Sequence, residues 1–133
     1  MSVSFANLIM AEPSPQARRL LWHVLSVGRV WRNEPEHHAG ADKAGLHLFW
    51  VVRGSGLLVT GNQRLNVAPG QECWLVDLRH QRSYLPDGRQ RLETAGFRFH
   101  GPALEAWREA FGNDVGFTFQ DARELAALQR AQR

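Results

Sequence analysis

The chain has 133 residues, of which 44% are hydrophobic and 22% are charged, and its formal net charge is +3. This length and composition fit one globular domain with a single core, and they exclude a disordered or fibrous protein. The basic residues are almost all arginines spread along the sequence, so no dense basic patch for nucleic acid is predicted.

The cysteine content and the hydropathy of the sequence indicate where in the cell the protein is expected. Cys73 is the single cysteine, which excludes a disulfide framework, and its apolar neighbours favour a buried structural thiol. No stretch reaches the roughly 18 apolar residues of a membrane span, and the N-terminus lacks the basic start and long apolar middle of a signal peptide. We therefore expect a cytoplasmic protein that does not contact a membrane.

The first 101 residues divide into an arm and a run of strands. Residues 1–19 show no clear period and contain two prolines, which predicts an extended N-terminal arm. From residue 20, short runs of strand-forming residues alternate with glycine and proline turns. These runs fall at residues 20–27, 30–31, 46–52, 57–60, 63–67, 72–76 and 89–99. The polar segment 33–45 is predicted as a loop, and the whole pattern favours a β-sandwich or barrel over residues 20–101.

Two helices are predicted in residues 102–133. The first, over 102–112, begins at Pro102, a residue that suits the first helical position. The second, over 121–132, begins with a capping box at Asp121. The apolar stripes of the two helices form a candidate dimer face, which comprises Leu104, Trp107, Phe111, Leu125 and Leu128. Packing of the same helices onto their own barrel is the alternative.

Four motifs follow one another between residues 26 and 111. They are Leu48–Gly56 (LFWVVRGSG), Leu65–Gly70 (LNVAPG), Tyr84 and Phe97–Pro102 (FRFHGP). In this order and spacing they resemble the N-terminal cupin domain of AraC-family transcription regulators. The resemblance implies a mainly β fold, a cupin-like (jelly-roll) β-barrel followed by two C-terminal α-helices.

The resemblance also implies a function. In that family the barrel binds a small organic effector, for which we expect a sugar or a small acid here, and the helices that follow form a homodimer. DNA is bound by a separate C-terminal domain with helix-turn-helix motifs, and this chain ends before such a domain. We therefore expect a sensor without catalytic residues or cofactors. A barrel with a filled interior, acting only as a dimerisation scaffold, is one alternative.

The metal-binding pattern of cupins is broken in this sequence. When the chain is aligned on Gly54, His47 takes the place of the glutamate, and Ala41 and Lys43 take the places of two histidines. Because a lysine ammonium opposes a bound cation, we expect no metal. A rearranged site in a stand-alone metal-dependent cupin enzyme, of the oxygenase or isomerase type, is the other alternative. Its ligands would be His38, His47 and His80.

Strand parity selects the candidate pocket residues. If His47 faces the interior, Phe49 does too, and the family resemblance implies the same for Tyr84 and Phe97. Arg82 shares the parity of Tyr84, and a buried arginine is costly unless paired, so Arg82 favours an anionic or polyhydroxylated effector. The predicted effector contacts are His47, Phe49, Arg82, Tyr84 and Phe97, with the weaker candidates Trp31, His38 and Trp74.

Overall fold

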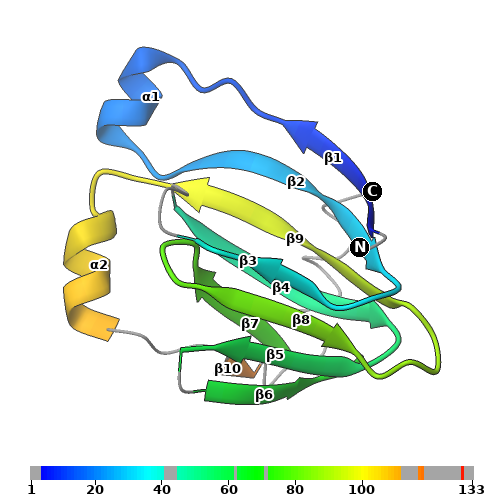
Figure 1. The fold of residues 1–133 in the computed structure, drawn as a ribbon. Helices are drawn as coiled ribbons and strands as arrows, with labels where there is room; N and C mark the ends of the chain where they lie inside the picture. The colour runs from blue at the N-terminus through cyan, green and yellow to red at the C-terminus, as the bar shows by residue number, and fades with distance from the viewer. Residues whose placement is uncertain are drawn as a thin grey trace.

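The computed structural model describes residues 4–40, 45–61, 63–70, 72–111, 117–118 and 130, and it consists mainly of two antiparallel β-sheets (Figure 1). The larger sheet contains, in spatial order, β1 (Ser4–Met10), β2 (His23–Arg32), β9 (Leu92–His100), β4 (Leu46–Arg53), β7 (Glu72–Asp77) and β10 (Phe117–Thr118). The smaller sheet contains β3 (Glu36–His38), β8 (Arg82–Pro86), β5 (Gly56–Thr60) and β6 (Gln63–Val67). The predicted mainly β architecture is confirmed.

The N-terminal segment is more ordered than the predicted arm. β1 forms an antiparallel ladder with β2 that extends from Ser4 opposite Arg32 to Met10 opposite Ser26. A short helix, α1 (Pro15–Leu20), follows, and the hydroxyl of its N-cap residue Ser14 accepts a hydrogen bond from the helix backbone. The ladder supplies partners for the backbone of β1, a contribution that the local sequence pattern does not reveal.

Three strands differ from their predicted outlines. β2 continues through Gly28, where an interruption is expected from the sequence, because this glycine is paired on both sides, with β1 and with β9. β3 lies inside the predicted loop 33–45, and β8 is not among the predicted strand runs. β3 and β8 pair with each other, so their conformation is determined more by tertiary pairing than by local sequence.

In the part of the chain that the structure describes, one substantial helix follows β9. α2 (Leu104–Phe111) occupies most of the predicted span 102–112, whereas the predicted helix 121–132, with Leu125 and Leu128, lies outside the described residues except for Arg130. Leu104 is 3% exposed, so it packs within its own domain, and Trp107 is half-buried. In the described chain, no helix is long and apolar enough to cross a membrane.

Apolar side chains pack on both faces of the larger sheet. One cluster lies between the sheets and comprises Phe49, Val51, Leu58, Val67, Trp74, Val76, Tyr84 and Leu92. A second cluster, on the other face of β4, comprises Trp50, Cys73 and Ala95, with Leu48, Val52 and Phe97 packed against it. Alternation along β4 explains why this strand reads as a continuous apolar run, since residues of both parities are covered. The core between the sheets fills only part of the space there.

Candidate ligand-binding cavity

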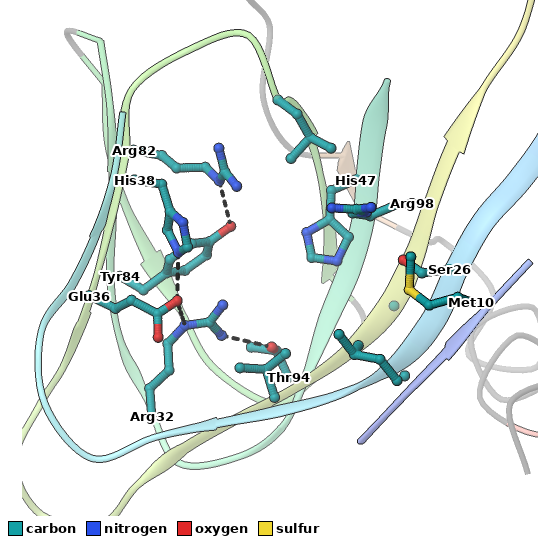
Figure 2. A pocket seen from close by; sticks show the side chains of 15 residues that line it. Met10, Ser26, Arg32, Glu36, His38, His47, Arg82, Tyr84, Thr94 and Arg98 are labelled. Atoms are coloured by element: carbon teal, nitrogen blue, oxygen red, sulfur yellow. Dashed lines mark hydrogen bonds and ion pairs between the residues drawn. The ribbon is translucent and has the colours of Figure 1, made fainter. Parts of the chain in front are cut away.

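A cavity of about 390 Å³ occupies the remaining space between the sheets. β1, β2, β4 and β9 of the larger sheet and β3 and β8 of the smaller sheet all contribute to its wall (Figure 2). The polar side chains in the wall are Ser26, Arg32, Glu36, His38, His47, Arg82, Tyr84, Thr94 and Arg98. The apolar ones are Leu8, Met10, Val30 and Leu78. This volume suits a small organic molecule.

Two glycines leave part of the cavity wall bare. Gly28 of β2 and Gly96 of β9 are directly opposite each other, and both line the cavity. A Cβ atom on Gly28 would lie 2.1 Å from the carbonyl oxygen of Asn7, and one on Gly96 would lie 2.1 Å from that of Leu48. Side chains are therefore excluded at both positions by neighbouring backbone.

Arg32 is the centre of a satisfied polar network. It is 4% exposed, and its Nε donates a hydrogen bond to Oε1 of Glu36 at 3.3 Å, while Nη1 donates to the hydroxyl of Thr94 at 3.1 Å. Its guanidinium carbon lies 4.0 Å from the centre of the Tyr84 ring. Glu36 also accepts a hydrogen bond from Nε2 of His38 at 2.5 Å. The charge of Arg32 is thus balanced inside the protein.

Arg82 and Arg98 have no such compensation. Nε of Arg82 donates to the hydroxyl of Tyr84 at 3.3 Å, but its Nη1 is buried without a hydrogen-bond partner among the described residues. Nε of Arg98 is likewise buried without a hydrogen-bond partner among the described residues. The described carboxylates form no ion pair with either guanidinium. Because a buried donor without a partner is costly, these two arginines, of which Arg82 is buried and Arg98 half-buried, are candidates for binding a ligand.

His47 is uncharged at neutral pH. Burial, together with the positive charges of Arg32, Arg82 and Arg98 and the neighbouring His38, lowers its pKa to about 3. The imidazole stacks on Phe49 with a centroid distance of 5.4 Å, and His47 lines the cavity. A strongly shifted pKa inside a cavity is typical of functional sites.

Comparison with known proteins shows a distant structural likeness. No protein-family model matches the sequence, and no curated protein matches it. Among solved structures, the chain is similar to a cupin superfamily protein from Desulfitobacterium hafniense. The match covers 72% of this chain and 78% of that chain, with a TM-score of 0.45 and 11% sequence identity. A likeness at this level carries no inference about ligand, activity or partners.

The structure brings four of the predicted effector contacts together around the cavity: His38, His47, Arg82 and Tyr84. Phe49 and Trp74 are buried in the adjoining core, where their rings stack with a centroid distance of 5.7 Å. Neither of these two residues lines the cavity.

Trp31 and Phe97 lie on the opposite face of the larger sheet. Trp31 precedes the inward-facing Arg32, so it points outward and its Nε1 donates to Oε1 of Glu93 at 2.7 Å. Phe97 lies between Gly96 and Arg98, both of which line the cavity, and it packs on Trp50. β9 keeps a regular register with β4 from Leu46 to Val51, so Phe97 and Arg98 face opposite sides of the sheet.

Sequence reasoning missed several cavity residues. Arg98 is the most important of them, and its position directly opposite His47 across β4 and β9 follows from the regular register of β9. Arg32 and Thr94 were missed for a related reason, since nothing in the sequence shows that β2 continues to residue 32 and pairs with β9. Alternation from Arg98 through Gly96 to Thr94 was the available signal.

The alternative histidine site is not assembled in the described part of the chain. His38 and His47 line the cavity, whereas His80 lies in a second, smaller pocket with Gln81, Arg82 and Ser83. Across the described residues, no three metal-ligating side chains converge. Ala41 and Lys43 stand at the two positions where the cupin metal pattern has histidines, and both lie outside the described residues.

Proposed function

We propose that this domain binds a small organic effector in the cavity between its sheets and is the sensing and dimerising domain of an AraC-type transcription regulator. The resemblance of residues 26–111 to that family supports the regulatory context. In such a regulator, a separate helix-turn-helix domain of the full-length protein binds DNA.

The uncompensated arginines are the observation that carries the proposal. A barrel that served only as a scaffold would gain stability by filling this space with apolar side chains. Here Arg82 and Arg98 instead line an open cavity, and each has a buried nitrogen atom without a hydrogen-bond partner among the described residues. A bound molecule that supplies the missing partners accounts for their presence.

The cavity wall provides a route from ligand to response. Leu8 and Met10 of the edge strand β1 line the cavity, although both side chains are more than half exposed. An effector that contacts them favours the conformation in which β1 is docked on β2, because a ligand shifts an equilibrium by its differential affinity for two states. The position of β1 would then report occupancy to the rest of the regulator.

A thermal-shift screen tests effector binding. The panel contains neutral sugars, polyols and amides and, separately, organic acids, and each compound is tested on the wild type and on a cavity-filling variant, Val30→Trp. We expect at least one compound to raise the Tm of the wild type by a few degrees and to leave the folded variant unchanged. If neither half of the panel stabilises the wild type, the proposed function is wrong.

Sedimentation equilibrium tests the proposed dimer. The chain has a mass of 15.1 kDa, and we expect twice this mass at micromolar concentration. The half-buried Trp107 of α2 belongs to the candidate face, so Trp107→Glu should shift the equilibrium to monomer. Glu109→Lys, an exposed change on the same helix, is the matched control and should leave the dimer intact. A monomeric wild type would contradict the proposed dimer.

A further inference from the structure

We infer that the effector is an organic anion whose oxyanion head binds between Arg82 and Arg98 and whose apolar body lies against β1 and β2. This inference rests on the proposed function and names the chemical class that the cavity takes. Arg82 extends from the smaller sheet, while Arg98 extends from the larger sheet, and both point into the space between the sheets (Figure 2).

The charges in the wall favour a negative ligand. Glu36 is the only carboxylate among the described lining residues, and it is already engaged by Arg32 and His38. Its charge therefore offsets Arg32 and leaves the charges of Arg82 and Arg98 uncompensated. Two guanidinium groups in a partly enclosed site hold an oxyanion more strongly than they would in water, because the local dielectric is low.

The two guanidinium groups that line the cavity without a carboxylate partner among the described residues mark where the head of the ligand binds. Nη1 of Arg82 and Nε of Arg98 are the buried guanidinium nitrogens without partners in the described cavity wall. An oxyanion offers several acceptor lone pairs, so one such group can accept from both arginines. Arg32 has a positioning role instead, because its donors are directed at Glu36 and Thr94.

His47 completes this end of the cavity without adding charge. It lies opposite Arg98 in the ladder of β4 and β9 and lines the same cavity. In its neutral form, one ring nitrogen donates and the other accepts a hydrogen bond. The site thus keeps two uncompensated positive charges and gains a neutral donor beside them.

Apolar side chains determine the other part of the ligand. Leu8 and Met10 of β1 and Val30 of β2 line the cavity with no polar atoms in their side chains. A sugar or free inorganic phosphate would bury hydroxyl or oxyanion groups against this wall without partners, which is unfavourable. A hydrocarbon body attached to the oxyanion matches both ends of the cavity.

Calorimetry with paired acids and amides tests the inference. The probes are hexanoate, octanoate and benzoate, each with its amide, together with hexyl phosphate and sodium phosphate. We expect at least one organic anion to bind at least about tenfold more tightly than its uncharged counterpart, hexanol being the counterpart of hexyl phosphate. A carboxylate preference and a phosphate-ester preference distinguish the two sources of the oxyanion.

Charge-removing variants locate the head of the ligand. Arg82→Gln and Arg98→Gln should each weaken binding of the preferred anion by at least about tenfold. Arg29→Gln is the matched control: it removes one arginine from β2, but Arg29 is half-exposed on the outer face, where it pairs with Glu93. This control should change the affinity by less than about twofold. Circular dichroism of each variant establishes that it is folded.

Three results would overturn the inference. These are equal affinity for acids and amides, binding of uncharged compounds alone, or equal effects of the three arginine substitutions. If uncharged molecules bind and anions do not, the inferred ligand class is wrong while the proposed effector function stands. If no compound binds, and the screen of neutral and acidic compounds also finds none, the proposed function fails with it.

Discussion

At the scale of single residues, the cavity is set apart by how its charges are distributed. Arg32 is held by Glu36, Thr94 and the ring of Tyr84, whereas Arg82 and Arg98 keep buried donors without partners in the described structure. A charged group with its full set of partners stabilises a local geometry, whereas a buried donor without a partner requires an explanation, for which we propose a ligand. The cavity wall therefore contains one arginine, Arg32, that is held in a hydrogen-bonded network, and two, Arg82 and Arg98, that are available to a ligand.

The lowered pKa of His47 makes stability depend on pH. The folded protein keeps this imidazole neutral down to a pKa of about 3, while the unfolded chain takes up a proton near the ordinary histidine pKa of 6.5. The stabilising contribution is therefore complete above the unfolded pKa and is lost as the pH falls below it. Between pH 7 and pH 5, we expect the wild type to lose about 2 kcal/mol more than His47→Gln in its free energy of unfolding.

Urea denaturation of both proteins at the two pH values measures this difference. His100, whose pKa is also lowered by burial and by its neighbours, is present in both proteins, so its contribution cancels in the comparison. Parallel losses in the wild type and the variant would show that His47 accepts a proton in the folded state.

At the scale of elements, β1 depends on a close approach to β2. Gly28 faces the backbone of Asn7 and Leu8, and an added Cβ would meet the carbonyl oxygen of Asn7 at 2.1 Å. We expect Gly28→Ala to lower the free energy of unfolding by about 2 kcal/mol, because the strands must separate to admit the methyl group. Urea denaturation measures the loss, and hydrogen exchange should show faster exchange in β1.

Val24→Ala is the control for this substitution, since Val24 lies in the same strand with its side chain exposed. It should change stability by less than about 0.5 kcal/mol. Equal effects of the two changes would mean that β1 is not held by close packing at Gly28.

α2 is joined to the larger sheet through Asp77. Its carboxylate accepts hydrogen bonds from Nε of Arg108 at 2.7 Å and from Nη2 at 3.0 Å. Burial alone would raise the pKa of Asp77, but the hydrogen bonds from Arg108 and from the backbone of Arg79 outweigh it and hold the pKa below its usual value. The carboxylate is therefore charged at neutral pH.

Asp77→Asn should lower the free energy of unfolding at neutral pH by about 2 kcal/mol, since Arg108 loses a buried charged partner. Glu105→Gln is the matched control, because Glu105 binds the same arginine from an exposed position. Its effect should stay below about 0.5 kcal/mol. Comparable losses in urea denaturation would show that the contact between α2 and β7 contributes little.

The elements were predictable to different degrees. β4 to β7 follow the predicted runs closely, because each run is bounded by glycine or proline turns that act locally. β1, β3 and β8 were not predicted, since partners distant in the sequence determine them. For the site, the family resemblance identified Tyr84 and parity with Tyr84 identified Arg82, whereas the same resemblance placed Phe97 on the wrong face and so concealed Arg98.

At the scale of the whole molecule, two sheets enclose a space that is filled in one part and hollow in another. Apolar side chains of both sheets pack around Phe49 in the filled part. The hollow part has charged residues from both sheets and bare backbone at Gly28 and Gly96. A molecule bound there would contact the smaller sheet and the larger sheet, including its edge strand β1, so ligand binding would affect both sheets.

The most direct test of this account is an NMR titration that follows the Nε–H resonances of the arginines while the preferred organic anion is added. The account predicts that the Arg98 and Arg82 resonances shift with the same saturable dependence on concentration, because the ligand head contacts both guanidinium groups, while that of Arg29 on the outer face stays constant. Saturable binding that leaves the resonance of Arg98 unchanged would contradict it.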